Sequence, residues 1–387
     1  MNSNDAMRHL KIINFGPLKE ADFELGRLNV IVGPQSSGKS SVLKIAAFCA
    51  WLEKRIELTQ CLSEASWKNV EEHLVDFYNL QGYFRTSTEI DYETDCLHIV
   101  CGYKNVRAEW NDGRFGYKRS KIAYIPAERN IVSVVSNWQK IQAAANVLEF
   151  MSEWDIARQS RTRALKILNL GVHYFFDKNS GMDKVQLDNG IGIDLSSASS
   201  GLQSLIPLYV NLSYLDKGQY RDRHKKENYI SRSENAKLFD FFLEKFAKGE
   251  LPPKVMKAIA GEAPGKNGRF EQKLVFSRLY DNYATVKNAQ IYLEEPENNL
   301  FPPEQVLLTE WLIRIGRDRF RKNVMFLATH SPYIVNCFLE REKKDFNLLI
   351  MTHSSDGRSV VKNVGEEDIQ KMYDSGVDVF FNFESFV

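Results

Sequence analysis

The spacing of apolar residues along the chain predicts strands that alternate with helices. Period-two patterns or short continuous apolar runs, typical of strands, occupy 9–32, 88–126, 171–176, 184–195, 289–295, 323–330 and 346–364. Apolar residues at helical spacing occupy 40–57, 64–82, 138–172, 201–215 and 303–316. Turn signals interrupt three of the strand regions, at Gly16-Pro17, Asn111-Asp112-Gly113 and Asp356-Gly357. This alternation favours an α/β fold whose central sheet is flanked by helices.

Composition adds that the chain is an ordinary globular one without a strong electrostatic preference. It has 387 residues, of which 43% are hydrophobic and 26% charged, enough for two domains or lobes. The formal net charge is +1, so no overall field attracts the chain to nucleic acid or to a membrane. No apolar run approaches the roughly 20 residues that span a bilayer. We therefore expect no membrane contact.

The cysteines bear on the compartment and on metal binding. Five of them, at 49, 61, 96, 101 and 337, form an odd and dispersed set, which favours a reducing cytoplasm over a disulfide framework. Cys96, His98 and Cys101 have the residue types of a partial metal site. They lie in an alternating strand pattern, however, and no second ligand pair follows. We expect ordinary sheet residues in a cytoplasmic protein.

Residues 216–288 differ in character from the rest of the chain. They begin polar and basic, continue with helical patterns, and contain a Gly/Pro-rich stretch at 252–268. The basic residues at the start are Lys217, Arg221, Arg223, Lys225, Lys226 and Arg232. Such a run is usually a solvated loop; the functional alternative is a docking surface for nucleic acid or for an acidic protein. The lack of interleaved aromatic residues favours the protein partner.

The stretch GPQSSGKS matches the pattern G-x-x-x-x-G-K-[ST] between an apolar strand and a helix. Its residues are Gly33, Pro34, Gln35, Ser36, Ser37, Gly38, Lys39 and Ser40, and Ser41 follows. Glycines let consecutive backbone N–H groups turn toward phosphate oxygens, and the helix N-terminus adds positive potential. Lys39 would reach the β- and γ-phosphates, and the Ser40 hydroxyl would ligate Mg²⁺. The motif predicts ATP and Mg²⁺ as cofactors.

Three carboxylates crowd the end of the strand at 289–295, where IYLEEPE contains Glu294, Glu295 and Glu297. A phosphate-loop site needs an acid that holds Mg²⁺ or its waters, and a second group that polarises the attacking water. Adjacent residues at a strand end project in different directions, so Glu294 can face the metal and Glu295 the water. A solvated charged turn is the simpler alternative.

The strand within 323–330 ends at His330, which can hydrogen-bond the γ-phosphate or the water. A lone histidine after a strand is usually structural. Its position behind a strand that follows the acid pair favours the functional interpretation.

Together, residues 33–40, 293–297 and 328–331 resemble the ABC-type ATPase heads of the SMC, RecF and OLD-nuclease group. The run EEPENNLFP is similar to the E-E-P-E-x-x-L-x-P run of the OLD-like branch, whose members are AAA ATPases. The resemblance covers both ends of the chain well and the middle poorly. Only strands follow His330, so it implies an OLD-like head without the C-terminal nuclease domain.

Heads of this group work as ATP-sandwich dimers, in which a signature serine and glycine act on the partner's γ-phosphate. The matching stretch is LSSASSGLQ, with Ser199, Ser200 and Gly201 before a helix, although a capped helix start is the alternative. After Glu297, Asn298 and Asn299 would form the loop that crosses the dimer interface.

Two positions depart from the resemblance. The first acid after the strand is usually aspartate and here is Glu294, whose extra methylene suits an acid that acts through a metal-bound water. SMC-like heads also carry a glutamine after the strand that leads into the helical lobe. Here that strand reads AYIPAERN, so Glu128 and Arg129 are the expected substitutes, and a salt-bridged loop is the alternative.

The resemblance implies a P-loop NTPase of ABC-ATPase type, with a mixed central sheet, an N-terminal antiparallel β subdomain and a helical lobe. Its expected parts are an N-terminal head segment (1–129), a helical lobe with the signature (130–215), an insertion (216–288) and a C-terminal head segment (289–387). Residues 130–172 lack the heptads of a long SMC coiled coil.

The function expected from the resemblance is slow ATP hydrolysis by a homodimer or higher homo-oligomer that switches a separate effector protein, in bacterial anti-phage defence. A DNA repair ATPase of RecF or SMC type is one alternative. A non-hydrolysing, ATP-dependent scaffold that holds a toxin is another.

Overall fold

The computed structural model describes residues 8–135, 137–221, 232–251, 268–341, 346–365 and 368. Arg223, Lys225 and Lys226 of the predicted basic run lie outside the described residues, as do 252–267 of the Gly/Pro-rich stretch.

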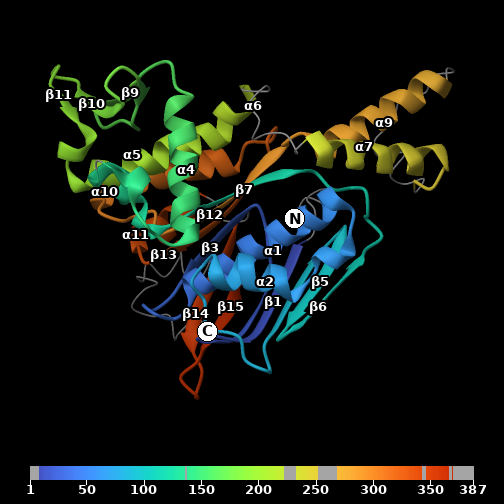
Figure 1. The fold of residues 1–387 in the computed structure, drawn as a ribbon. Coiled ribbons are helices and arrows are strands. Elements are labelled where there is room, and N and C mark those ends of the chain that lie inside the picture. The colour runs from blue at the N-terminus through green and yellow to red at the C-terminus, as the bar shows by residue number, and fades with distance from the viewer. Residues whose placement is uncertain are drawn as a thin grey trace.

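A large mixed sheet forms the centre of the described chain (Figure 1). Its strands are β1 (Arg8–Phe15), β2 (Leu18–Glu24), β3 (Leu28–Val32), β4 (Glu89–Thr94), β5 (Leu97–Gly102), β6 (Asn105–Trp110), β7 (Ser120–Ile125), β12 (Asn288–Glu294), β13 (Val324–Thr329), β14 (Asn347–His353) and β15 (Ser359–Val364). They lie in the order β6-β5-β4-β1-β2-β15-β14-β3-β13-β12-β7. The predicted mixed central sheet is confirmed.

The sheet has a parallel half and an antiparallel half. Strands β14, β3, β13, β12 and β7 pair in parallel. Strands β2, β1, β4, β5 and β6 pair antiparallel, and β15 joins the halves by pairing with both β14 and β2. The expected N-terminal β subdomain is thus continuous with the central sheet, because the β14–β15 hairpin fills the position between them.

Helices cover both faces of the sheet. They are α1 (Lys39–Thr59), α2 (Trp67–Val70), α3 (Ile131–Val134), α4 (Ala145–Gln159), α5 (Ser200–Ser213), α6 (Gln219–Arg221), α7 (Arg232–Ala247), α9 (Gly268–Ala284), α10 (Pro302–Gly316) and α11 (Pro332–Arg341). Shorter 3₁₀ or π turns are η1 (Leu62–Glu64), η2 (Glu71–Asp76), η3 (Ala127–Asn130), η4 (Trp138–Lys140), η5 (Leu195–Ser197) and η6 (Tyr214–Gly218).

Alternate residues of the parallel strands enter two separate cores. Ile291 and Leu293 of β12 pack with the side chains of α4, α5, α10 and α11, whereas Tyr292 packs on the opposite face with those of α1. This is the consequence of the two-residue period of a strand. The sheet is therefore buried on both faces, as a parallel sheet requires.

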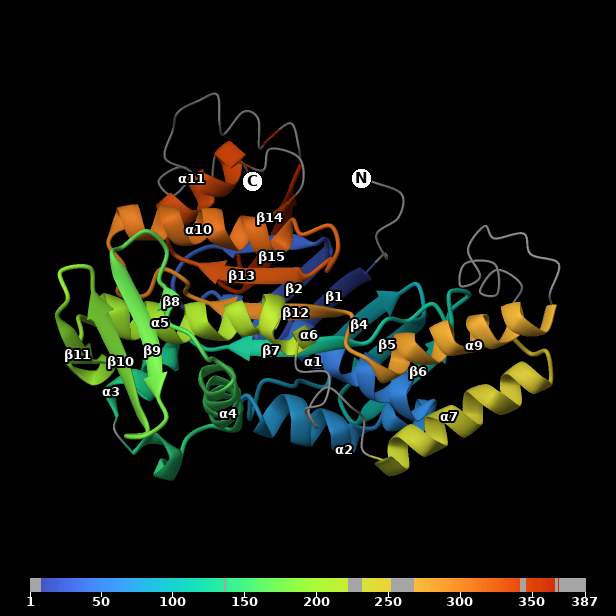
Figure 2. The same cartoon turned by 90° about the horizontal axis from the view of Figure 1, so that it is seen from above.

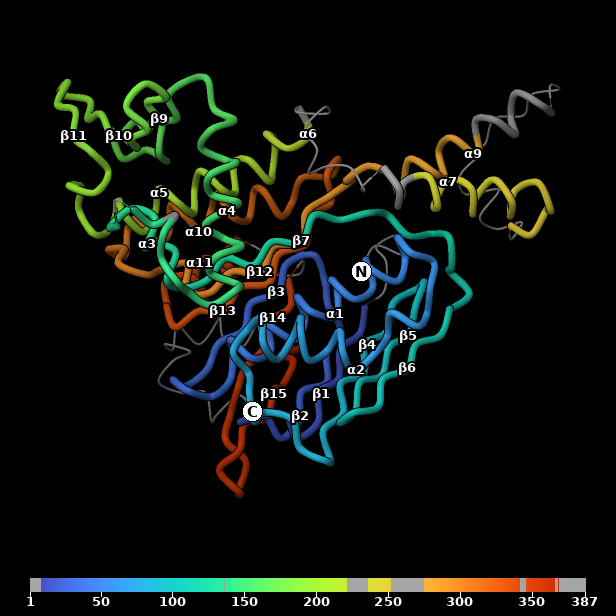
Figure 3. The backbone as a smooth tube through the Cα atoms, viewed as in Figure 1, coloured from blue at the N-terminus to red at the C-terminus, as the bar shows by residue number. Residues whose placement is uncertain are grey.

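A second, small sheet lies beside α4 and α5. Its strands are β8 (Leu165–Lys166), β9 (Val172–Asp177), β10 (Met182–Leu187) and β11 (Gly192–Asp194), in the order β11-β10-β9-β8. Helices α7 and α9 pack against each other and extend from the body away from this sheet (Figures 2 and 3).

Three local predictions need correction. The helix expected over 138–172 is confined to α4, because the chain turns at Ser160 and β8 then pairs with β9. The helical part of 64–82 is short, with a π turn over η2. Helix α11 follows His330, where only strands were expected. The turn predicted at Asn111-Asp112-Gly113 is present and follows β6.

Candidate functional site

The phosphate-loop motif connects the end of β3 to the start of α1, as the sequence predicted. Two of its glycines are required by space and by backbone conformation. A Cβ at Gly33 would lie 2.6 Å from the Met351 Cβ, and Gly38 has a φ of +101°. Gly38 precedes α1 without any side-chain cap, so the first N–H groups of the helix stay available to an anion.

Lys39 is folded onto its own loop. Its Nζ donates to the carbonyl oxygens of Gly33 (2.9 Å) and Pro34 (2.6 Å), and the residue is 5% exposed. Burial lowers the pKa of Lys39 to about 8, against the opposing effect of the Glu295 and Glu297 carboxylates. The ammonium group is therefore mainly charged at neutral pH and held by neutral carbonyls, which a phosphate can replace.

The rest of the motif divides into exposed and buried serines. Ser37 is buried and its hydroxyl donates to the Pro34 carbonyl (2.8 Å), so it stabilises the loop. Ser41 is also buried. The exposed residues of the loop are Pro34, Gln35, Ser36 and Ser40. Ser40, the predicted hydroxyl ligand of Mg²⁺, is thus exposed at the first turn of α1.

Parallel pairing brings the motifs to one edge of the sheet. Strand β13 lies between β3 and β12, with Thr329 opposite Val32 and Ala328 opposite Glu294. The carboxyl ends of all three strands therefore meet where the phosphate loop begins. This edge is where parallel α/β sheets bind ligands.

Glu295 and His330 face each other at this edge. The distance from His330 Nε2 to Glu295 Oε1 is 3.9 Å. Burial and the Glu294 carboxylate raise the pKa of Glu295, while Arg129 lowers it; burial and the Lys39 ammonium lower the pKa of His330. The pKa of the carboxylate is thus raised and that of the imidazole lowered by the burial that the two share. The predicted catalytic pair is brought together beside Lys39.

Glu295 has a backbone conformation that L-residues seldom adopt. Its φ is +41°, and its N–H donates to the Ala328 carbonyl (2.8 Å). A left-handed residue other than glycine is strained, and such residues cluster at functional sites. This backbone conformation turns the chain sharply at the end of β12.

Glu294 points into a buried polar contact. The Tyr124 hydroxyl donates to Glu294 Oε1 (2.7 Å), the Ala127 N–H donates to Oε2 (3.4 Å), and the glutamate is 7% exposed. Glu294 and the Ser40 hydroxyl are hard oxygen donors of the kind Mg²⁺ prefers. In the described part of the chain, no group of three or more His, Cys, Asp or Glu could hold a metal ion. Their chemistry suits a Mg²⁺ whose other ligands would be phosphate oxygens and water, and the assignment of these two residues as ligands stays a prediction.

Glu297 has a role that the sequence analysis did not foresee. Its carboxylate accepts hydrogen bonds from the His330 N–H (2.6 Å) and the Thr329 hydroxyl (2.9 Å). Burial raises its pKa, against those hydrogen bonds. The side chain therefore joins the ends of β12 and β13 and orients the His330 backbone. A sequence signal was present, because a third acid followed the pair by only one proline.

Asn298 and Asn299 bind other parts of the same chain. Asn298 Nδ2 donates to the Ala127 carbonyl (3.2 Å), and Asn299 Nδ2 donates to the Ser204 hydroxyl of α5 (2.8 Å). A Cβ at Gly201 would lie 3.1 Å from the Asn299 carbonyl oxygen. The loop after Glu297 therefore packs on the first turn of α5.

Ser199 and Ser200 are exposed at the start of α5. The Ser199 hydroxyl accepts from the Leu202 N–H (3.4 Å), so this serine is an N-cap, the alternative noted from the sequence. The cap leaves both side chains at the surface. A contact with a partner's nucleotide therefore stays a prediction.

Glu128 and Arg129 lie in η3, at the exit from β7. Glu128 is exposed, whereas Arg129 is 1% exposed. The Arg129 guanidinium donates to the carbonyl oxygens of Glu294 (2.9 Å) and Glu295 (2.6 Å) rather than to solvent. Neither the expected nucleotide contact nor the alternative salt-bridged loop describes these bonds.

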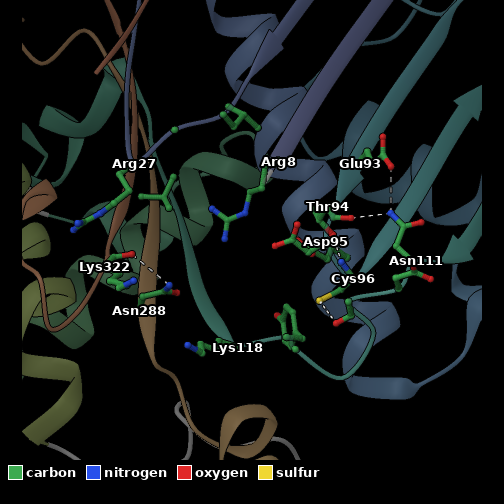
Figure 4. A pocket seen from close by; sticks show the side chains of 18 of the residues that line it. Arg8, Arg27, Glu93, Thr94, Asp95, Cys96, Asn111, Lys118, Asn288 and Lys322 are labelled. Carbon is green, nitrogen blue, oxygen red and sulfur yellow. Dashed lines mark hydrogen bonds between the residues drawn. The ribbon is translucent and has the colours of Figure 1, made fainter. Parts of the chain in front are cut away.

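A cavity of about 870 Å³ lies elsewhere, at the amino ends of the parallel strands (Figure 4). Arg8, Arg27, Glu53, Glu93 and Lys118 are among its lining residues. It contains both signs of charge and none of the phosphate-loop residues, so the candidate site is assigned to the opposite edge of the sheet.

His98 and Cys101 lie in β5, as predicted, whereas Cys96 lies in the turn between β4 and β5. Cys96 Sγ donates to the Gly113 carbonyl (3.3 Å), and His98 lies between Asp91 (3.0 Å) and Glu109 (3.2 Å). All five cysteines are free. Within the described helices, none is long and apolar enough to cross a membrane.

Comparisons with known proteins give distant structural matches alone. No protein-family model matches the chain, and no curated protein does. The SMC head domain from Thermotoga maritima is 11% identical, with a TM-score of 0.42, over 93% of this chain and 99% of that one. The Smc head domain bound to the C-terminal domain of ScpA, derived from Pyrococcus furiosus, is 10% identical, with a TM-score of 0.44, over 96% and 99%.

Proposed function

We propose that this chain is an ABC-type ATPase head that binds ATP with Mg²⁺, hydrolyses it slowly as a homodimer and thereby switches a separate effector. The observation that carries the proposal is the meeting of Lys39, Glu295 and His330 beside the uncapped N-terminus of α1. A phosphate cradle, a carboxylate base and a neutral imidazole are the groups that water attack on a γ-phosphate requires.

Each group has a defined task in the proposed reaction. The α1 N–H groups and Lys39 bind the phosphates, and Glu295 accepts a proton from the attacking water. His330 orients the water or the γ-phosphate by a hydrogen bond. Bound Mg²⁺, held with Ser40 and Glu294, would neutralise phosphate charge.

The dimer and the defence role are finer parts of the proposal. Support for the dimer comes from the SSG stretch at the exposed start of α5 and from its contact with the loop at 298–299. Support for a role in anti-phage defence comes from the resemblance of EEPENNLFP to the OLD-like branch.

The test is ATP hydrolysis by the purified chain, with and without Mg²⁺, beside the Lys39→Ala variant. We expect slow turnover that requires Mg²⁺ and is lost with Lys39. Turnover that rises only with DNA ends or gaps would favour the repair ATPase. Tight ATP binding without turnover would favour the toxin-holding scaffold, and no ATP binding would contradict the proposal.

A further inference from the structure

Arg129 is an unusual residue for its location, because an arginine is almost never fully buried without a partner. Its guanidinium donates to the carbonyl oxygens of Glu294 (2.9 Å), Glu295 (2.6 Å), Pro296 (3.3 Å) and Pro126 (3.3 Å). All four acceptors are backbone groups. A planar guanidinium offers five donors on three nitrogens in a fixed fork, so it can reach carbonyls that lie farther apart than the three donors of a single ammonium nitrogen can.

The carbonyls that Arg129 binds belong to the segment that presents the proposed base. The ladder between β12 and β7 ends at Leu293, so the next carbonyl groups need donors from elsewhere. Within this segment Glu295 has its left-handed φ of +41°. Arg129 therefore holds the strained turn from the side of β7, while the Ala328 carbonyl holds it from the side of β13.

Charge explains why the buried cation is stable. Burial lowers the pKa of Arg129 to about 10, and Glu297, Glu295, Glu294 and Glu128 oppose that effect. The guanidinium thus stays protonated at neutral pH. It offsets the charge of several carboxylates that the nucleotide site crowds together.

The location of Arg129 connects the site to the helices. Turn η3 follows β7, continues into α3, and packs against α4 and α5. The same segment supplies Tyr124 and Ala127 to Glu294, and the Ala127 carbonyl to Asn298. A displacement of α5 would therefore be transmitted to the turn at Glu295 through η3.

We infer that Arg129 is a positioning residue: through the carbonyls of 294–296 it fixes Glu295 in the orientation that water attack requires, and it couples that orientation to α5. The inference rests on the proposed ATPase function. Arg129 itself touches neither nucleotide nor water in this role. Its loss therefore affects the rate of the chemical step and leaves ATP affinity intact.

The experiment compares Arg129→Lys with wild type and with Arg158→Lys. Arg158 is a matched control because it is also a buried arginine, 5% exposed. It forms ion pairs with Asp155 and Asp183, and neither of these belongs to the candidate site. We expect Arg129→Lys to lower kcat by about 10–100-fold, because small misplacements of a catalytic group cost that much. ATP affinity should match wild type, and the loss of thermal stability should not exceed that of Arg158→Lys, whose kcat stays normal.

Chemical rescue supplies a readout that a purely structural role would not move. Arg129→Ala removes the fork and leaves room for a free guanidinium ion. Millimolar guanidinium should raise kcat of Arg129→Ala, whereas ammonium at the same concentration should not, and neither should activate Glu295→Gln. If Arg129→Ala does not fold, Arg129→Lys decides the question.

The failures can be told apart. Wild-type kcat in Arg129→Lys, with an active wild type, would overturn the inference and leave the proposed function standing. A fall in ATP affinity at unchanged kcat would overturn it too, since Arg129 would then contact nucleotide. An inactive wild type would refute the ATPase proposal and the inference together.

Discussion

At the scale of single residues, the chemistry of the site depends on groups whose ordinary properties are changed by their neighbours. Lys39 is buried against carbonyls, Glu295 is crowded by Glu294, and His330 faces a cation. Perturbed groups of this kind cluster at functional sites. Glu297 is different, because hydrogen bonds to the β13 end hold it in a structural role.

Glu295→Gln should lower kcat by roughly 10²–10⁴-fold, because it removes the proton acceptor and keeps the shape of the side chain. ATP binding should persist, which equilibrium binding with a fluorescent nucleotide would measure. Glu310→Gln is the control: Glu310 pairs with Arg341 at the surface (2.7 Å) and should retain wild-type turnover. Normal hydrolysis by Glu295→Gln would remove this residue from the role of base.

The pKa of about 8 at Lys39 predicts that ATP affinity falls at alkaline pH. The charged ammonium favours phosphate binding, so affinity is retained below pH 8. It should fall above pH 8, by up to about tenfold per pH unit, as the free protein loses that proton. Titration of binding from pH 7 to pH 10 would show this slope. Lys39→Arg stays charged throughout and should flatten it; an equal slope in both proteins would exclude Lys39 as the cause.

At the scale of elements, the site depends on how α10 and α1 pack against the two faces of the parallel strands. The end of α10 lies against the start of β3, where Arg27 donates to the Gly316 carbonyl (2.6 Å). A Cβ at Gly316 would lie 2.2 Å from Leu28 Cδ2. The strand that carries the phosphate loop is thus fitted closely to a helix that follows the acid pair in sequence.

Gly316→Ala should lower the free energy of unfolding by about 1–3 kcal/mol, the usual result of overpacking a core. Chemical denaturation monitored by circular dichroism would measure the change. Gly192→Ala is the matched control, since a Cβ there meets nothing within 4 Å. Equal stability of the two variants would show that Leu28 yields easily and that the contact is not restrictive.

At the scale of the whole molecule, the proposed dimer places the exposed start of α5 against a second head, which would complete the site. Ser199 and Ser200 lie there in solvent, and the loop at 298–299 packs on the same helix turn. An ATP-dependent dimer would bury both features together. Closure of the dimer would also displace α5, and η3 would transmit this displacement to the turn at Glu295.

Ser199→Arg should leave ATP binding by each chain unchanged and stop hydrolysis, because a bulky cation blocks docking of the two heads. Mixing it with Lys39→Ala should restore turnover to at most one site per dimer. Ser87→Arg, an exposed serine in the loop before β4, should behave as wild type. Full activity of Ser199→Arg would place the partner contact on another surface.

Periodicity and motif spacing were sufficient for the α/β class, for the position of the phosphate-loop motif between a strand and a helix, and for the strands that end just before Glu295 and His330. Those features are local, because a phosphate-binding loop between a strand and a helix needs glycines and a lysine in a fixed order, whatever the rest of the chain does. The sequence could not show the order of the strands, because pairing joins residues far apart in the chain. It therefore did not predict that β15 makes the two halves one sheet.

The hydrogen-bond partners of Arg129 and Glu297 were decided by the tertiary structure. A charged residue in a loop is usually solvated, and nothing in the sequence distinguishes one that is buried. Arg129 follows β7, which lies beside β12, so its guanidinium reaches the carbonyl oxygens of Glu294 and Glu295 at the end of β12. Glu297 joins the ends of β12 and β13 because the two strands end side by side, so its carboxylate accepts hydrogen bonds from the Thr329 hydroxyl and the His330 N–H. Local sequence thus determined which chemical groups the candidate site contains, and the packing of distant strands determined which of them lie at the proposed nucleotide site and which hold the others in place.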